Sequence, residues 1–145
     1  QGTAPALLQM MNEATAKGLD YFAMQHADIE PEDWWLDTLI AEMDGKTAGV
    51  ALVREKFLLG DYLELLGVAP WTRHAGVGAA LLAHVEQIVF TRTKNLFACV
   101  SDFNAPARAF YKKHGFQEIG PMPDFLIPGS AEMLLRKTAG PARKS

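Results

Sequence analysis

Apolar residues recur three or four positions apart in two stretches of the chain. In residues 5–26 they are Leu7, Leu8, Met11, Ala14, Leu19, Phe22 and Ala23. In residues 76–90 they are Val77, Leu81, Val85, Ile88 and Val89. Such spacing gives an α-helix one apolar face, so both stretches are predicted to be amphipathic helices. Pro31, which acidic residues follow, predicts a short helix that carries Trp34 and Trp35.

Boundary residues mark a further helix in NAPARAFYKKH, residues 104–114. Asn104 is a favourable N-cap, because its side chain accepts hydrogen bonds from backbone N–H groups, and Pro106 suits the first turn. Gly115 is the residue type expected just past a helix C-terminus. The segment is therefore predicted to be a helix that stops at Gly115.

Runs of strand-like composition fill much of the rest of the chain. Residues 37–55 contain two such runs around Asp44-Gly45, which is a strong hairpin signal. A third strand, YLELLGV, covers residues 62–68 and is ended by Pro70. Further strands are predicted at residues 96–100, 116–120 and 131–137. The segment PMPDFLIPG, residues 121–129, is predicted to be a proline-rich loop that gates or lines a site.

The order of these elements predicts an α/β fold, with a mixed central β-sheet flanked by helices. The strands at 62–68 and 96–100 enclose a helix, so we expect them to be parallel and joined by a right-handed crossover. The chain has 145 residues, 49% of them hydrophobic and 21% charged, which is typical of one domain, predicted over residues 3–137. Residues 138–145 are predicted to be a flexible tail, and the initial QG resembles the end of a cleavage linker.

Charge and composition argue against several classes of protein. The chain has 14 basic and 17 acidic residues, which disfavours a nucleic-acid partner. No stretch approaches the roughly 20 apolar residues of a membrane span and nothing resembles a secretory signal, so we expect a cytoplasmic protein without a membrane partner. The single cysteine, Cys99, excludes an internal disulfide and is interpreted as a packed residue of LFACV. The histidines lack metal-ligand spacing, so no metal is predicted.

The segment RHAGVGAALL, residues 73–82, places Arg73 and two glycines directly before a helical apolar run. Glycine lets the backbone approach a ligand closely, and the N–H groups at a helix start attract anions, so a bound phosphate is the first interpretation. Close packing of the helix explains the glycines equally well. A nucleotide phosphate loop is disfavoured, because neither the Lys-Ser/Thr ending nor the G-x-G-x-x-G spacing is present.

Two segments together carry a resemblance to a known family. VAPWTRHAGVGAALL resembles the signature of the GNAT superfamily of acyl-CoA-dependent N-acyltransferases, a strand ending in V-x-P, then (R/Q)-x-x-G-x-(G/A) and a helix. NAPARAFYKKHGF is similar to the family's N-x-x-A-x-x-x-Y-x-x-x-G-F. The matching residues are Val68, Pro70, Arg73, Gly76, Gly78, Asn104, Ala107, Tyr111, Gly115 and Phe116. The resemblance implies the GNAT fold and extends over about residues 36–136.

The resemblance also implies acetyl-CoA, or a related short acyl-CoA, as the molecule bound at the first motif. The backbone amides of residues 74–79 are expected to cradle the pyrophosphate, Arg73 to add charge, and Val68 to pair with the pantetheine arm through its backbone. The expected cofactor-binding residues are Val68, Arg73, His74, Ala75, Gly76, Val77, Gly78, Ala79 and Asn104.

Aminolysis of a thioester needs a neutral amine and a protonated leaving group. Tyr111, like the matching family tyrosine, is expected to protonate the departing sulfur, although tyrosines on helices also serve to pack their rings. Glu64 resembles the strand glutamate that some family members use as a base, directly or through water. Alternatively, Glu64 lies on a solvated face of its strand. Glu42 and Asp102 are then further candidates for the base.

One feature departs from the family pattern. The family fold usually begins with a strand before the first helix, whereas this chain reaches PALLQMMNEA almost at once. Either that strand is absent or another segment covers the sheet edge. A homodimer is one alternative for the oligomeric state. The acceptor is expected near aromatic residues of the first two helices and the late loop, although these also close cores: Tyr21, Phe22, Trp34, Trp35 and Phe125.

The sequence thus predicts an N-acetyltransferase that moves an acetyl group from acetyl-CoA to a primary amine of a small molecule or peptide. Attack is expected to be direct, in a ternary complex. The alternative is a non-catalytic acyl-CoA-binding regulatory module, which would keep RHAGVGA and lose turnover. Tyr111 argues against that alternative.

Overall fold

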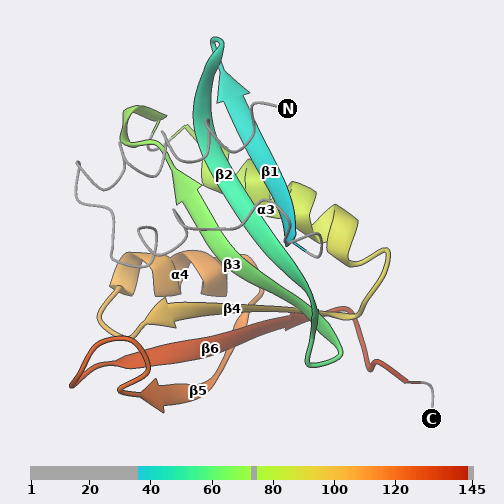
Figure 1. The fold of residues 1–145 in the computed structure, drawn as a ribbon, viewed down its shortest axis with the longest axis vertical. Helices are drawn as coiled ribbons and strands as arrows, with labels where there is room; N and C mark the ends of the chain where they lie inside the picture. Colours follow the sequence, from blue (N-terminus) through green and yellow to red (C-terminus); the bar gives the residue numbers. More distant parts are fainter. Residues whose placement is uncertain (1–35, 73–74, 144–145) are drawn as a thin grey trace. The chain divides into compact units, whose positions relative to one another are not determined.

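The computed structural model describes residues 36–72 and 75–143, with side chains from residue 38 onward. Its elements are β1 (Leu36–Met43), β2 (Lys46–Phe57), β3 (Gly60–Val68), the 3₁₀ turn η2 (Pro70–Thr72), α3 (Val77–Val89), β4 (Asn95–Ser101), α4 (Ala105–Lys113), β5 (Gln117–Pro123) and β6 (Ala131–Thr138) (Figure 1). The helices predicted before residue 36 and the question of an initial strand lie outside the described residues.

The strands form one mixed sheet in the order β1-β2-β3-β4-β6-β5. The β3–β4 pair is parallel, whereas β1–β2, β4–β6 and β5–β6 are antiparallel. The predicted mixed sheet and its predicted parallel pair are therefore confirmed. By compactness the chain divides into two units, residues 1–55 with 64–88 and residues 56–63 with 89–145. The single domain over residues 3–137 stays a prediction.

The first unit contains the predicted hairpin. β1 and β2 pair from Leu36 with Arg54 to Met43 with Lys46, with a register shift between Ala41 and Glu42. The turn residues Asp44 and Gly45 have φ values of 54° and 77°. Positive φ at both central positions is the type I′ geometry, whose twist matches that of the flanking strands. The Asp-Gly signal is thus confirmed.

A close approach between β2 and α3 fixes the helix in the first unit. A Cβ atom on Gly49 would lie 2.7 Å from Cδ1 of Leu81, 2.8 Å from Cγ1 of Val77 and 3.1 Å from the carbonyl oxygen of Gly67. Leu81 and Val77 are themselves buried. Glycine is therefore the residue that lets α3 lie directly against β2, and this contact locates the first turn of the helix.

The second unit packs α4 on one face of its strands. Leu96, Ala98 and Val100 of β4 are buried, and Ala98 pairs with Leu135 of β6. Leu135 lines one hollow together with Tyr111 of α4, so α4 lies over this face. The remaining alternate residues of β4, Phe97, Cys99 and Ser101, point to the opposite face.

The proline-rich segment is only partly a loop. Residues 121–123 belong to β5, where Pro121 pairs with Met133 of β6, so the loop predicted over residues 121–129 is wrong for its first three residues. β5 is the last strand of the sheet order, and an edge strand tolerates proline because its outward N–H groups need no partner. The rest of the segment is closed by Asp124, whose carboxylate accepts from the backbone N–H of Gly129 at 2.7 Å.

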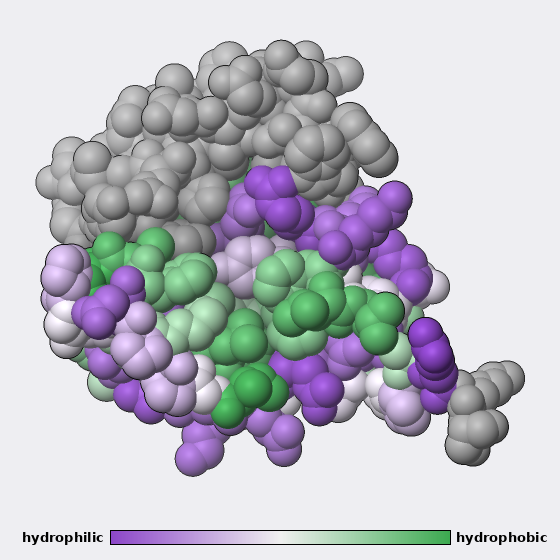
Figure 2. All heavy atoms as spheres, turned by 60° about the horizontal axis from the view of Figure 1, so that its bottom comes forward, coloured by the Kyte–Doolittle hydropathy of each residue, from purple (hydrophilic) through white to green (hydrophobic). Residues whose placement is uncertain are grey.

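Apolar side chains also reach the surface of the second unit. Five large ones are more than half exposed: Leu58, Leu59, Phe103, Ile119 and Phe125. Figure 2 shows hydrophobic residues gathered across one face of the molecule and bordered by polar residues. Leu58 and Leu59 form the β2–β3 turn with φ values of 48° and 59°, a conformation that Asn and Gly adopt more easily, so this turn is strained.

Replacement of Gly49 by alanine is expected to destabilise the protein. The added methyl would overlap Leu81 and Val77 in a packed interior, and overpacking of this kind costs about 1–3 kcal/mol of unfolding free energy. Urea unfolding measures the loss. Gly120→Ala is the matched control, because a Cβ at Gly120 meets no atom within 4 Å. Equal stabilities of the two variants would refute the close approach of α3 to β2.

Candidate functional site

The turn that follows β3 is tied firmly to β2. The Oγ1 atom of buried Thr72 donates to the carbonyl of Ala69 at 2.9 Å and lies 3.3 Å from that of Ala48. The backbone N–H of Ala69 donates to the same Ala48 carbonyl at 2.7 Å. The chain therefore leaves the sheet from a fixed point just before the glycine segment.

The first turn of α3 presents free backbone N–H donors and contains no acidic side chain. The first α-helical bond runs from the N–H of Ala80 to the carbonyl of Gly76 at 3.0 Å, so Gly76 occupies the N-cap position with φ 79°. The amides of residues 76–79 therefore have no partner within the helix. No acidic residue lies in the first turn, and Ala75 and Gly76 are exposed. The positive end of the helix dipole makes this turn suited to an anion.

Among the predicted cofactor residues of the first unit, Ala75, Gly76, Val77, Gly78 and Ala79 lie at this helix start. Val77 is buried and anchors the turn, whereas Gly78 and Ala79 are half-buried. Val68 is the last residue of β3 and is half-buried. Arg73 and His74 lie outside the described residues, so their expected roles stay predictions.

Glu64 is a buried carboxylate with a cationic neighbour. It is 9% exposed, and its Oε1 atom accepts from Nε of Arg54 on β2 at 2.5 Å. The alternative of a solvated strand face for Glu64 is therefore wrong. Sequence reasoning missed Arg54, which holds the carboxylate in one orientation. Removal of one partner of a buried ion pair is costly, so a structural role stands beside the predicted role as a base.

Asn104 caps α4 as its sequence position predicts. Its Oδ1 atom accepts from the backbone N–H of Ala107 at 3.1 Å, and Pro106 lies in the first turn. The cap uses the side-chain oxygen and leaves the Nδ2 donor to other contacts. A cofactor contact of Asn104 therefore requires no loss of the cap.

Tyr111 is held by neighbouring aromatic rings in the second unit. It is 8% exposed, and its ring centroid lies 5.4 Å from that of Phe110 and 5.1 Å from that of Phe116, both in edge-to-face contact. The Tyr111 ring is therefore packed, as tyrosine rings on helices often are, and this packing gives it a defined place from which its hydroxyl can act. Asn104 and Tyr111 lie on the same helix.

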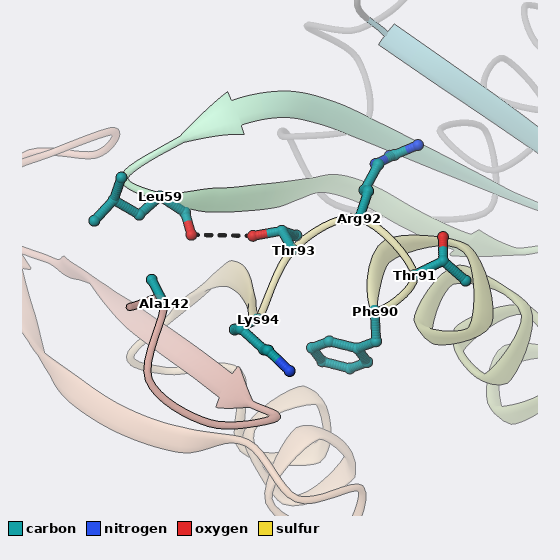
Figure 3. A pocket seen from close by; sticks show the side chains of 7 residues that line it. All are labelled: Leu59, Phe90, Thr91, Arg92, Thr93, Lys94 and Ala142. Atoms are coloured by element: carbon teal, nitrogen blue, oxygen red, sulfur yellow. Dashed lines mark hydrogen bonds between the residues drawn. The ribbon is translucent and has the colours of Figure 1, made fainter. Parts of the chain in front are cut away.

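Two hollows are found among the described residues of the second unit. One, of about 430 Å³, lies at Tyr111, Phe116 and Glu118. The other, of about 450 Å³, follows α3 and is lined by Leu59, Phe90, Thr91, Arg92, Thr93, Lys94 and Ala142 (Figure 3). Arg92, one of the two cations that line it, forms an ion pair with buried Asp61 at 2.8 Å. Thr93 donates to the carbonyl of Leu59 at 3.0 Å, which steadies the strained turn.

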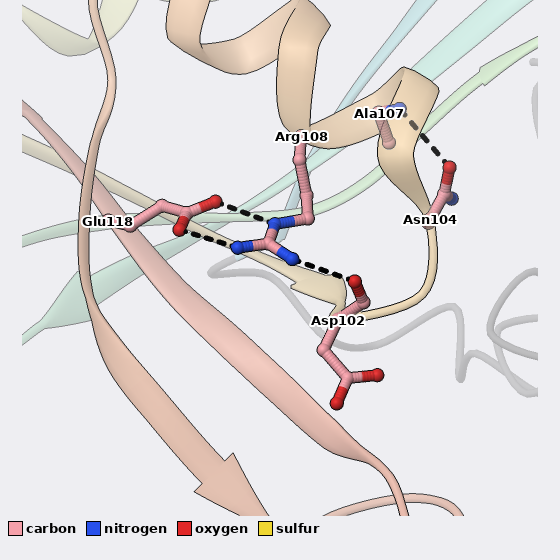
Figure 4. A network of polar contacts seen from close by, with 5 residues as sticks. All are labelled: Asp102, Asn104, Ala107, Arg108 and Glu118. Atoms are coloured by element: carbon pink, nitrogen blue, oxygen red, sulfur yellow. Dashed lines mark hydrogen bonds and ion pairs between the residues drawn. The ribbon is translucent and has the colours of Figure 1, made fainter.

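Sequence reasoning also missed a polar network at the start of α4. Arg108 forms a two-bond ion pair with Glu118 of β5 and donates a third bond to the carbonyl of Asp102 (Figure 4). This hydrogen-bonded pair raises the pKa of Arg108 and lowers the pKa of Glu118. No local sequence signal reveals the pair, because helix and strand residues meet here only through the tertiary fold.

Cys99 lies in an environment that favours an unreactive, protonated thiol. It is half-buried, and its burial raises the pKa of the thiol. A hydrogen bond with Tyr62 lowers this pKa, whereas the negative charge of Glu132 raises it further. Glu132 is buried and accepts from Oγ of Ser101 at 2.5 Å. A raised pKa disfavours the nucleophilic thiolate, in keeping with the interpretation of Cys99 as a packed residue.

Two further features bear on candidate chemistry. Among the residues that the structure describes, no cluster of three or more His, Cys, Asp or Glu side chains could hold a metal ion. No helix in the described ranges is long and apolar enough to cross a membrane.

Comparisons with known proteins agree over most of the chain. Residues 6–116 match the family described as "Acetyltransferase (GNAT) family". The chain is 31% identical over 118 residues to peptidyl-lysine N-acetyltransferase YiaC of Escherichia coli, covering 77% of this chain and 75% of that protein. Its fold is similar to that of a GNAT-family protein from Desulfovibrio desulfuricans, with a TM-score of 0.80, 26% identity and coverage of 94% and 92% of the two chains. Ribosomal-protein-alanine N-acetyltransferase from Brucella melitensis gives a TM-score of 0.76 and 25% identity, with 94% of each chain covered.

The two expected roles of Asn104 can be separated by substitution. Asn104→Ala removes the cap and is expected to lower the unfolding free energy by about 1 kcal/mol. Asn104→Asp keeps an acceptor at the N-cap, so its stability should stay close to that of the unchanged protein. If the Nδ2 donor contacts the cofactor, both variants bind acetyl-CoA more weakly in calorimetry. Unchanged affinity in Asn104→Asp would leave Asn104 as a cap alone.

Proposed function

The chain belongs to the acetyltransferase (GNAT) family, and from this premise we propose that it acetylates a primary amine of a peptide or small molecule. Family membership makes it an acetyl-CoA-dependent transferase. The proposal concerns the acceptor, direct attack in a ternary complex and the roles of individual residues.

The observation that carries the proposal is the exposed first turn of α3. The amides of residues 76–79 have no partner within the helix, and the first turn contains no acidic residue. A pyrophosphate fits such a set of donors, because backbone N–H groups and the helix dipole both favour negative charge. In the proposal these amides bind the pyrophosphate of acetyl-CoA, and Arg73 and His74 contribute to the same site. The N–H of Ala75 already donates to the carbonyl of Thr72 at 3.1 Å, so it is not counted among these donors.

The acyl arm needs an extended partner. The proposal assigns it to the end of β3, where the backbone of Val68 pairs with pantetheine amides while its half-buried side chain stays in the protein. The Nδ2 donor of Asn104 adds a polar contact. Thr72 supports this arrangement, because its two carbonyl contacts fix the path of the chain between Val68 and the helix start.

The acceptor nitrogen loses two protons during the reaction. The acceptor's ammonium group gives one proton to Glu64, directly or through water, which frees the nitrogen lone pair to attack the thioester carbon. The carbon–sulfur bond then breaks with its electron pair moving to sulfur, and the Tyr111 hydroxyl supplies the proton that makes the thiol. The second proton of the nitrogen restores Tyr111 through water. Arg54 orients Glu64 for this work.

The acceptor class is the least constrained part of the proposal. The relative at 31% identity is named for action on peptidyl lysine, which favours an exposed amine on a peptide over a small molecule. The aromatic residues expected near the acceptor lie mostly before residue 36, outside the described residues. A cytoplasmic location and a homodimer stay predictions.

Thiol release from acetyl-CoA tests the proposed function. The panel contains a lysine-bearing peptide, the same peptide with acetylated lysine and a free N-terminus, a polyamine and an aminoglycoside. We expect thiol release and a mass increase of one acetyl group with an unmodified amine of the panel. Binding of acetyl-CoA without turnover across the whole panel would instead support the regulatory module that binds acyl-CoA.

Gly78→Glu tests the first turn of α3 as the pyrophosphate site. The substitution adds bulk and negative charge next to the proposed anion, so acetyl-CoA affinity should fall at least tenfold, or about 1.4 kcal/mol. Ala80→Glu is the matched control, because Ala80 is exposed and its amide already donates to Gly76. Calorimetry that gives equal affinities for folded Gly78→Glu and the control would remove this turn from the site.

A further inference from the structure

Arg108 uses its guanidinium in three directions at once. Nε donates to Oε2 of Glu118 at 2.8 Å and Nη2 to Oε1 of the same carboxylate at 2.9 Å. Nη1 donates to the carbonyl oxygen of Asp102 at 2.8 Å. The planar fork of arginine matches a carboxylate in this way, whereas a lysine ammonium makes only a point contact. One side chain thus links α4 to β5 and to the turn that follows β4.

The turn that Arg108 grips is itself fixed to β6. The N–H of Asp102 donates to the carbonyl of Ala131 at 2.8 Å, and its Oδ2 atom accepts from the N–H of Ala131 at 3.1 Å. Glu118 lies on β5, whose partner strand is also β6. Both acceptors of Arg108 are therefore fixed through β6, Glu118 by strand pairing and the Asp102 carbonyl by the hydrogen bonds of its turn. Arg108 thus fixes the position of α4 relative to β6.

Arg108 lies on α4. The proposed function gives a role to Asn104, the N-cap of this helix, and to Tyr111 within it. α4 has nine residues, and a helix this short takes its stability and orientation from tertiary contacts. The backbone N–H of Arg108 donates to the carbonyl of Asn104 at 3.0 Å. Tyr111 follows Arg108 by three residues, so both lie on one side of the helix, and both line the same hollow.

We propose that Arg108 is a positioning residue, which sets the rotation of α4 and thereby places the Tyr111 hydroxyl for proton transfer. This inference rests on the proposed function, since it concerns the proton donor of that reaction. Arg108 itself contacts neither the acyl donor nor the acceptor. A shift of the helix by a fraction of a turn would leave the fold intact and misplace the hydroxyl, which is the kind of error that lowers turnover.

A general stabilising role explains the network less well. Both side chains of the pair are 35% exposed, and exposed ion pairs contribute little to stability. Lys112 is a second cation near Glu118, yet Arg108 alone reaches both Glu118 and the Asp102 carbonyl. Because the pKa of Glu118 is lowered, the pair is complete at neutral pH and is lost only in acid, as the pH falls through that lowered value.

Arg108→Lys, made with and without Tyr111→Phe, tests the proposal by single-turnover kinetics. Tyr111→Phe alone should slow acetyl transfer at least tenfold, because proton transfer by a placed side chain contributes about 10²–10⁴-fold. Arg108→Lys alone should slow it about fivefold to tenfold with an unchanged KM for acetyl-CoA. In the Tyr111→Phe protein, Arg108→Lys should cause almost no further loss, because the hydroxyl that it positions is gone.

Two controls accompany this cycle. Lys113→Gln removes a charge from the same helix at an exposed position and should leave the rate unchanged. The exchange Arg108→Glu with Glu118→Arg re-forms a charge pair but reverses its fork and loses the bond to Asp102. It should leave the melting temperature close to that of the unchanged protein and still slow the rate.

The outcomes separate this inference from the proposed function. The rate loss of the double variant could equal the product of the losses in Arg108→Lys and Tyr111→Phe. That result would show that Arg108 acts independently of Tyr111 and would overturn the inference. If the protein acetylates no amine, the proposed function fails, and NMR of the tyrosine rings still decides the inference. The Tyr111 ring signals should then shift in Arg108→Lys and not in Lys113→Gln, and unchanged signals in both variants would overturn it.

Discussion

The first turn of α3 is the constraint on which the rest of the account depends. A helix start can receive an anion only if its N–H groups stay open and its position is fixed. The structure provides both conditions from the first unit alone. Thr72 ties the preceding turn to Ala48 of β2, and the absence of a side chain on Gly49 lets the helix pack directly against the same strand. One strand therefore locates both ends of the glycine segment.

Elements with strong local signals could be predicted from the sequence. The Asp44-Gly45 turn requires positive φ at both positions, and the Asn104 cap satisfies a backbone donor three residues away, so neither depends on distant residues. The prolines of β5 misled the prediction, because closely spaced prolines next to a strand were interpreted as a loop, whereas an edge strand or a bulge tolerates them. Whether a strand lies at an edge depends on the order of the whole sheet, so the seven residues of β5 alone do not reveal it.

The candidate site divides in the same way. The glycine spacing and the Asn104–Tyr111 spacing are local and were visible in the sequence, whereas the partners that orient the side chains were not. Arg54 reaches Glu64 from another strand, and Arg108 reaches Glu118 from a helix. Ion pairs of this kind fix the orientation of side chains, and proton transfer requires a defined orientation of the groups that take part.

The central claim is that the backbone of residues 76–79 receives the pyrophosphate of acetyl-CoA. Titration of ¹⁵N-labelled protein with acetyl-CoA, followed by amide NMR, observes these groups directly. The account predicts that the amide signals of Gly76, Val77, Gly78 and Ala79 shift most, because a new hydrogen bond to a charged acceptor changes each of them. Signals of these four residues that stay in place while others move, such as those of residues 90–94 around the second hollow, would contradict it.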